Sequence, residues 1–154
     1  FKEKDMHLLS ALLIFEGKEG IEMNESRKGM RLEPFTFTIE AGKIREFAQA
    51  LGDDNPDYET GKRIPPTFAT VIEFWGSKRP MEDVLQLNMA KVLHAGQEYE
   101  YVGAMAVGDQ ITCEGEVIDA YTRAGMNFVV VENKYKNQRG ELVLISRSTI
   151  IERS

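Results

Sequence analysis

The sequence contains very few of the residues that form disulfides and metal centres. It has one cysteine, Cys113, and two histidines among 154 residues. A single cysteine cannot form an intrachain disulfide, and without a Cys/His cluster a structural zinc site is not supported. We therefore expect a protein of a reducing compartment, the cytoplasm, that binds no metal ion.

Positive charge and long apolar runs are also scarce. The chain carries 19 Lys and Arg against 25 Asp and Glu, a formal net charge of −6, which argues against nucleic acid as a main partner. The apolar run at residues 8–15 is too short for a membrane span, which takes about 20 residues. The sequence has no G-x-G-x-x-G motif and no P-loop, so we expect no cofactor.

What the sequence does have is the composition of a folded domain. Hydrophobic residues make up 42% of the chain and charged residues 29%, which is typical of a globular protein. We expect an N-terminal extension over residues 1–27, with an amphipathic helix in its first part. One domain is expected over residues 28–154.

The most apolar stretch within this domain is Pro65–Gly76, PPTFATVIEFWG. Its bulky apolar residues recur at i, i+3, i+4 and i+7, as on one face of a helix. They are Phe68, Val71, Ile72 and Trp75. Only Glu73 is charged, and its spacing puts it at one edge of this face, where we expect solvent or an interface. The pattern predicts a buried central helix.

Strand-like segments surround this helix in the sequence. Phe35–Glu40 alternates apolar and polar residues, which predicts a half-buried strand, and the residues after it up to Leu51 predict an amphipathic helix. The last third is rich in β-branched and aromatic residues between turn-like separators. Its predicted strands are Val92–Val102, Ile111–Tyr121, Asn127–Tyr135 and Leu142–Ile151. Short connections predict that these four form an antiparallel meander.

An early strand, a buried helix and a later meander are the elements of an α+β hotdog fold. In that fold a curled antiparallel sheet wraps around a central helix. Such a sheet leaves an edge to be covered, so we expect a dimer. Another α+β sandwich topology is also compatible with the pattern.

Three segments carry a resemblance to a known family. They read IREFAQALGDDNPDY at residues 44–58, IPPTFAT at 64–70 and VLHAGQEYEY at 92–101. In this order they resemble the MaoC-like hotdog dehydratases, above all the acyl-binding subunits of heterodimeric (3R)-hydroxyacyl-thioester dehydratases. The resemblance covers about residues 28–152.

The resemblance implies a reaction and the residues that perform it. Family members add water to trans-2-enoyl thioesters of CoA or acyl carrier protein, or remove it from (3R)-hydroxyacyl thioesters. An Asp and a His in the pattern GDxNPxH hold the water, and a backbone N–H at the start of the central helix polarises the thioester carbonyl. Carried over, the Asp is Asp53, the Asn is Asn55 and the His position holds Tyr58.

The Tyr at position 58 is a departure with chemical consequences. A tyrosine hydroxyl has an ordinary pKa of about 10, against about 6.5 for histidine, so it is a poor proton shuttle near neutral pH. In the acyl-binding branch a sister chain commonly carries the catalytic pair. The resemblance therefore implies a dehydratase or hydratase subunit that needs a catalytic partner chain and is inactive alone.

Each of these residues also has a plain structural interpretation. Asp53 and Asn55 suit a turn after a helix without any catalysis, and Tyr58 suits a half-buried packing position. His94 matches the family's LHxxQ and is a candidate replacement for the missing His, or a structural residue of a strand. At the start of the central helix, Thr67 and Phe68 are candidates for substrate binding, and Thr67 also suits a helix N-cap.

Three other functions stay open. The first is a self-sufficient homodimeric hydratase. The second is an acyl-CoA thioesterase in which Glu73 or Asp53 activates water, and the third is an acyl-thioester binding module without activity. The segment between Tyr58 and Pro65 is shorter than is usual in the family. The acyl chain length and the choice of CoA or acyl carrier protein are not specified by the sequence.

Overall fold

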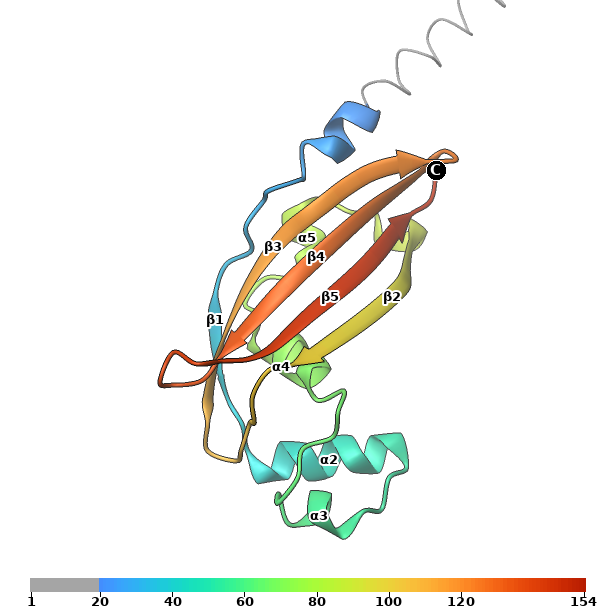
Figure 1. Ribbon diagram of the computed structural model, residues 1–154. Coiled ribbons are helices and arrows are strands. Elements are labelled where there is room, and N and C mark those ends of the chain that lie inside the picture. Colours follow the sequence, from blue (N-terminus) through green and yellow to red (C-terminus); the bar gives the residue numbers. More distant parts are fainter. Residues whose placement is uncertain (1–19) are drawn as a thin grey trace, which may run out of the picture.

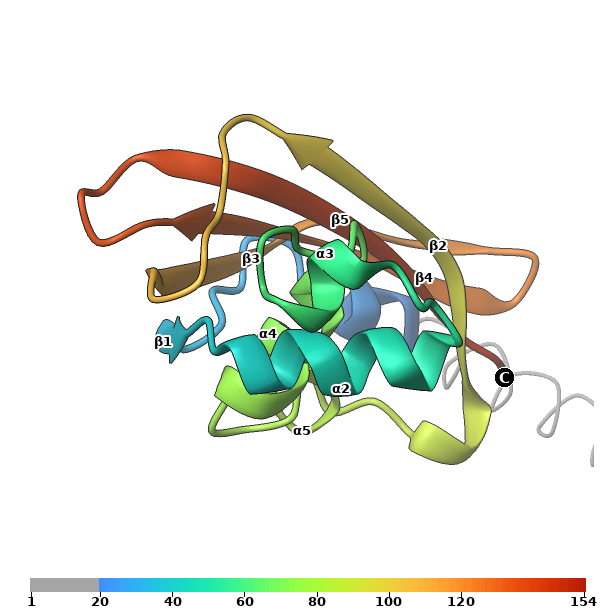
Figure 2. The same ribbon diagram turned by 90° about the horizontal axis from the view of Figure 1, so that it is seen from below.

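A computed structural model describes residues 20–154, in which five strands form one antiparallel sheet. The elements in chain order are β1 (Phe35–Thr38), α2 (Ala41–Leu51), α3 (Pro56–Glu59), α4 (Ala69–Gly76), α5 (Met81–Leu85), the 3-10 turn η1 (Met89–Lys91), β2 (Val92–Tyr101), β3 (Gln110–Arg123), β4 (Met126–Lys136) and β5 (Leu142–Glu152). Helices α2 to α5 all lie on one side of the sheet, which curves over them (Figure 1, Figure 2). The α+β class predicted from the sequence is confirmed.

The strand order is β1-β3-β4-β5-β2. All five predicted strands are present, but the predicted four-strand meander is wrong at β2, which pairs with β5 instead of β3. The connection from β2 to β3, residues 102–109, is about eight residues long and can reach roughly 26 Å. That exceeds the roughly 14 Å across three strand spacings, so the chain can cross the sheet.

Helix α2 confirms the helix that was predicted to end at Leu51. Ile44 and Ala48 are its buried residues. Gly52 ends the helix in the left-handed conformation, with φ 69°, and its N–H donates to the carbonyls of Ala48 and Gln49. Glycine adopts this conformation without steric cost, and the following turn therefore leaves the helix at a defined angle.

The central helix α4 is shorter than predicted and begins at Ala69 instead of Pro65. The helical conformation is disfavoured for a residue that precedes a proline, which applies here to Ile64 and Pro65. The helix therefore does not begin at Pro65. Phe68 occupies the N-cap position and no side chain caps the helix, so the expected Thr67 cap is wrong.

The predicted apolar face of α4 is correct at three of its four positions. Phe68, Val71 and Ile72 are buried, but Trp75 is 63% exposed. Its ring lies beneath the ammonium group of Lys43, 4.9 Å from the ring centroid, instead of against the sheet. The helix is only about two turns long, and its last turn presents this side chain to the outside.

Two apolar clusters fill the space between the sheet and the helices. The first lies under α2 and α4 and includes Ile44, Phe68 and Tyr135. The second lies under α5 at the other end of the sheet and includes Leu85 and Val131. Along β4 and β5, the inward positions between the two clusters are polar, so a polar row separates them.

The segment before residue 28 packs against the rest of the chain. Asn24 is buried, and its Nδ2 donates to the carbonyl of Tyr121 at 2.9 Å. The buried Arg27 donates from Nε to the carbonyl of Leu85 at 2.9 Å. The division of the chain at residues 27 and 28 stays a prediction, and most of the expected N-terminal helix lies outside the described residues. No helix within residues 20–154 is long and apolar enough to cross a membrane.

Candidate functional site

Glu73 on α4 lies at the centre of the polar row. Its Oε1 accepts hydrogen bonds from Asn133 Nδ2 at 3.1 Å, from Ser146 Oγ at 3.2 Å and from the hydroxyl of Tyr135. The expected solvent position is therefore wrong for Oε1, and the expected interface position of Glu73 stays a prediction. The carboxylate points at the inner face of the sheet, and side chains from two strands fix its orientation.

The strand register explains why these donors meet. Asn133 and Tyr135 are two residues apart on β4, so both face inward. Ser146 on β5 lies directly opposite Asn133. On the other side Asn133 lies opposite Gly115, where a Cβ atom would lie only 2.4 Å from Asn133 Oδ1. Glycine at position 115 thus leaves the room that Asn133 needs to reach Glu73.

The second carboxylate oxygen, Oε2, has no hydrogen-bond partner among residues 20–154. No fully buried side-chain oxygen or nitrogen in these residues lacks a partner, so Oε2 is not sealed inside the protein. Glu73 lines a cavity of about 410 Å³. We infer that Oε2 opens into this cavity.

We call this cavity the α4–α5 groove. Along α4 it is lined at helical spacing, and it continues over α5 and the start of β1. Its apolar lining residues are Leu32, Phe35, Phe74, Pro80, Met81, Val84 and Cys113, and its polar or charged ones are Glu33, Thr70, Glu73, Ser77, Arg79, Glu82 and Asn133. Apolar and polar side chains thus share the lining, and Glu73 contributes the charged group midway along α4.

Burial raises the pKa of Glu73 above its ordinary value, as the largest effect on this group. The hydrogen bonds from Asn133 and Ser146, and the charge of His94, act in the opposite direction but do not cancel it. A carboxyl group with a raised pKa holds a proton more strongly than an exposed one does, which suits acid–base chemistry.

Tyr99 extends the polar row to β2. Its hydroxyl lies 3.1 Å from Thr70 Oγ1, and it lies opposite Ser146 in the sheet. Burial raises the pKa of Tyr99, the hydrogen bond with Thr70 lowers it, and the charge of Glu73 raises it further. The neutral hydroxyl is therefore the form that this position favours.

The thiol of Cys113 also borders the groove, but it is not an activated nucleophile. Cys113 is buried. Burial raises the pKa of the thiol, and the charges of Glu73 and Glu114 raise it further. Because the thiolate is the reactive form, Cys113 acts here as a small buried hydrophobe.

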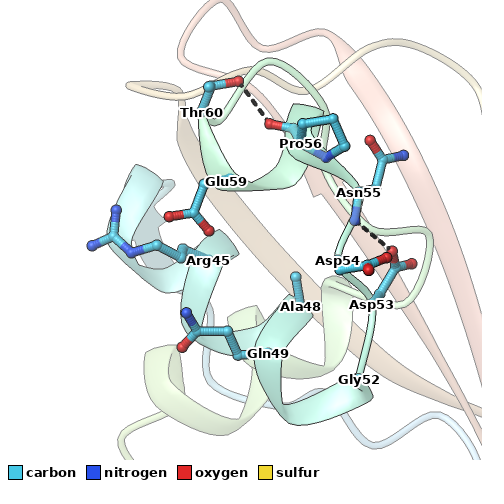
Figure 3. A pocket seen from close by; sticks show the side chains of 10 residues that line it. All are labelled: Arg45, Ala48, Gln49, Gly52, Asp53, Asp54, Asn55, Pro56, Glu59 and Thr60. Carbon is cyan, nitrogen blue, oxygen red and sulfur yellow. Dashed lines mark hydrogen bonds between the residues drawn. The ribbon is translucent and has the colours of Figure 1, made fainter.

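The turn that carries Asp53 lies at a different place, beside a cavity of about 550 Å³ between α2 and α3 (Figure 3). Asp53 is exposed, and its Oδ1 accepts the backbone N–H of Asn55 at 3.1 Å. Asn55 in turn caps α3 by accepting the N–H of Asp57 at 3.0 Å. Both side chains therefore hold the local backbone.

The other predicted site residues do not gather at this turn. Tyr58 and Phe68 are buried together in the first apolar cluster. His94 is exposed near the start of β2, at the end of the sheet away from α2 and α3 (Figure 1). A single chain therefore does not bring His94 to Asp53.

Thr67 is exposed just before α4, where backbone donors are free. The N–H of Phe68 donates to the carbonyl of Pro65, and those of Thr70 and Val71 to carbonyls one turn back. No acceptor within residues 20–154 takes the N–H of Thr67 or of Ala69. Free N–H groups at a helix start carry partial positive charge that can stabilise a developing oxyanion.

Residues 26–146 match the family described as FAS1-like, dehydratase domain region. This chain belongs to that family. The FAS1-like dehydratase chain is 31% identical over 137 residues to a UPF0336 protein of Streptomyces avermitilis, with 80% of this chain and 91% of that protein covered. A UPF0336 protein of Saccharopolyspora erythraea is 33% identical over 133 residues, covering 78% and 85%.

Solved structures confirm the hotdog fold. The HadBC (3R-hydroxyacyl-ACP dehydratase) complex of Mycobacterium tuberculosis matches with a TM-score of 0.69 at 22% identity, over 81% of this chain and 96% of that one. A MaoC-like dehydratase matches with a TM-score of 0.73 at 20% identity, over 84% and 43%. The ChsH1–ChsH2 complex of Mycobacterium tuberculosis gives 0.67 at 17% identity, over 91% and 92%. The predicted MaoC-like resemblance is confirmed.

The Glu73 network could hardly be predicted from the sequence. Its donors are 60 to 73 residues away along the chain, on strands whose order the sequence does not specify. One signal was present. Asn133 and Ser146 interrupt apolar residues at inward positions of predicted strands, and Glu73 interrupts an apolar helix. Within residues 20–154, no group of three or more His, Cys, Asp or Glu is placed to hold a metal ion.

Proposed function

We propose that this FAS1-like dehydratase chain is the acyl-binding subunit of a hydratase or dehydratase. Its substrates are trans-2-enoyl and (3R)-hydroxyacyl thioesters of CoA or acyl carrier protein. The observation that carries the proposal is Tyr58, which stands in the position of the family's proton-transferring His and is buried in the first apolar cluster. A partner subunit then supplies the Asp–His pair.

The start of α4 provides the thioester site. The N–H groups of Thr67 and Ala69 are free to donate to the thioester carbonyl, at the positive end of the helix. One turn later Thr70 enters the α4–α5 groove. The acyl group extends along this groove, where Phe74, Met81 and Val84 offer apolar contact.

This chain does not assemble an acid–base pair at its motif turn. Asp53 uses Oδ1 for the N–H of Asn55 and is exposed to solvent. A hydroxyl such as that of Tyr58 is a weak proton donor near neutral pH because its ordinary pKa is about 10. Since proton transfer needs a group that titrates near the working pH, the chain alone is expected to bind without turnover.

A surface suited to a partner lies along β2. This strand is at one end of the sheet order, so its outer backbone groups are unpaired within residues 20–154. Large apolar side chains are exposed on it, with Leu93 at 47% and Tyr101 at 50%. The names of the HadBC and ChsH1–ChsH2 neighbours are names of complexes, which supports assembly with a second subunit.

The test is hydration of crotonyl-CoA and of a longer trans-2-enoyl-CoA, followed by loss of enoyl absorbance. We expect the purified chain to bind both thioesters saturably without turnover. Turnover is expected when a MaoC-like chain with an intact GDxNPxH motif is added. Robust hydration by the chain alone, lost in Asp53→Asn, would overturn the proposal and favour a self-sufficient homodimer.

Hydrolysis of the thioester is a second candidate function, and one observation favours it. Glu73 holds a free oxygen in the groove and has a raised pKa, as a base that activates water requires. Release of free CoA from acyl-CoA by the wild-type chain, lost in Glu73→Gln and without any hydration, would favour this function. Release that is absent, or equal in both proteins, would exclude this role of Glu73.

A further inference from the structure

We propose that Glu73 is a specificity residue, which makes the α4–α5 groove select acyl groups that carry a hydrogen-bond donor beyond the reacting carbons. A hydroxyl or an amide N–H on the acyl chain fits this description. The inference rests on the proposed function, because it takes the thioester to lie at the start of α4. It concerns the far part of the acyl group and not the chemistry at the carbonyl.

The two carboxylate oxygens of Glu73 have different surroundings. Oε1 accepts three hydrogen bonds from Asn133, Tyr135 and Ser146. These bonds fix the plane of the carboxylate, so Oε2 keeps one direction. A carboxylate oxygen is an acceptor only, and the matching group on a ligand is therefore a donor.

Apolar side chains line part of the groove into which Oε2 opens. Leu32, Phe35, Phe74, Met81 and Val84 contribute apolar surface to the same groove. A plain alkyl chain would fit these side chains but would remove water from Oε2 without replacing its hydrogen bond. A site built to bond a polar group discriminates against the analogue that lacks it far more strongly than an apolar pocket discriminates by size.

The position of Oε2 along the acyl chain follows from the geometry of a helix. Glu73 is six residues after Thr67, which is about 9 Å along a helix axis. Because side chains lean toward the helix start, the carboxylate lies at most about 9 Å along the axis beyond Thr67 and about 6 Å beyond Ala69. Several methylene groups cover this span, which puts the donor beyond the reacting carbons.

The charged side chains that line the groove are mostly negative. Besides Glu73 the groove contains Glu33 and Glu82, against one cation, Arg79. This excess of carboxylates disfavours an acyl group that ends in its own carboxylate. A donor that is neutral or positively charged is the group that these side chains favour.

The experiment measures binding of saturated acyl-CoA thioesters, which cannot undergo hydration, to the full chain by calorimetry. The matched pairs are butanoyl, hexanoyl and octanoyl-CoA against their 4-, 6- and 8-hydroxy forms. For at least one length we expect the wild-type chain to bind the hydroxylated thioester about tenfold or more tightly than the plain one.

Two variants separate recognition from folding. Glu73→Gln can keep the three bonds to Oε1 but puts an NH₂ donor where Oε2 was, so preference should move from hydroxyl donors to acceptors. A hydroxyl can also accept from this NH₂, so the discriminating ligand is a ketone, which accepts but cannot donate. We expect Glu73→Gln to bind 5-oxohexanoyl-CoA more tightly than wild type does. Glu59→Gln, the same charge change on the exposed α3, should behave as wild type.

The outcomes distinguish this inference from the proposed function. Equal binding of plain and hydroxylated thioesters at all three lengths overturns the role of Glu73 and leaves acyl-thioester binding intact. Equal affinity of wild type and Glu73→Gln for 5-oxohexanoyl-CoA also overturns it. Failure of every thioester to bind the folded chain overturns the proposed function and this inference together.

Discussion

Asp53 and Glu73 are two carboxylates in very different surroundings. Asp53 sits in the GDDNP turn, exposed, with one bond to the backbone N–H of Asn55. Glu73 sits on α4 outside any motif, accepts bonds from three side chains of two strands, and keeps one oxygen free toward the groove. The motif position marks the family, whereas burial and a free acceptor mark the place suited to ligand chemistry.

The largest expected effect comes from removing the half-buried carboxylate of Glu73. Glu73→Leu leaves the donors of Asn133, Tyr135 and Ser146 without their shared acceptor, which should cost about 2–3 kcal/mol of unfolding free energy. Urea denaturation followed by circular dichroism measures this. A change below about 0.5 kcal/mol would mean that the three donors find other partners.

Gly115→Ala, a substitution in strand β3, should disturb the same hydrogen bonds to Glu73. The new Cβ would lie 2.4 Å from Asn133 Oδ1 and 2.9 Å from Leu32 Cδ1, so Asn133 must move. We expect a loss of about 1–2 kcal/mol. The matched control is Gly42→Ala on α2, where the nearest atom is 3.8 Å away and alanine should stabilise the helix by about 0.5–1 kcal/mol. Equal effects of the two substitutions on the unfolding free energy would contradict the role of Gly115 in leaving room for Asn133.

The pH dependence of stability should separate Glu73 from the exposed carboxylates. Burial raises its folded-state pKa above 4.5, so folding favours the protonated form. This contribution is complete below about pH 4.5 and is lost as the pH rises through the folded-state pKa. Between pH 4 and 8 the wild type should therefore lose stability relative to Glu73→Gln, by about 1.4 kcal/mol per pH unit between the two pKa values. If the unfolding free energies of the two proteins change in parallel with pH, the raised pKa of Glu73 is contradicted.

The smallest effect is expected at the motif. Asparagine can accept the N–H of Asn55 as the carboxylate of Asp53 does, so Asp53→Asn should change the unfolding free energy by less than about 0.5 kcal/mol. Binding of saturated acyl-CoA should also be unchanged. A weakening of tenfold or more would place Asp53 in the acyl-binding site.

The comparison also shows which parts of the structure the sequence could predict. The strands and α2 were predicted because alternation, helical spacing and a terminal Gly52 are local signals. The place of β2 beside β5 was not, because the sequence does not order strands. Trp75 was misplaced because spacing defines a face of α4 but not how far the sheet extends to cover it. The Glu73 network was missed because its members meet only after the sheet has formed.

The open side of β2 determines how this chain behaves when it is made alone. Its outer backbone groups form a template to which another strand can add, which is a route to aggregation. Glu98 is exposed on this strand, so two copies paired edge to edge would bring like charges close together. Salt weakens that repulsion, since screening acts over about 8 Å at physiological ionic strength. We expect the chain alone to stay dispersed in dilute buffer and to self-associate as salt is added.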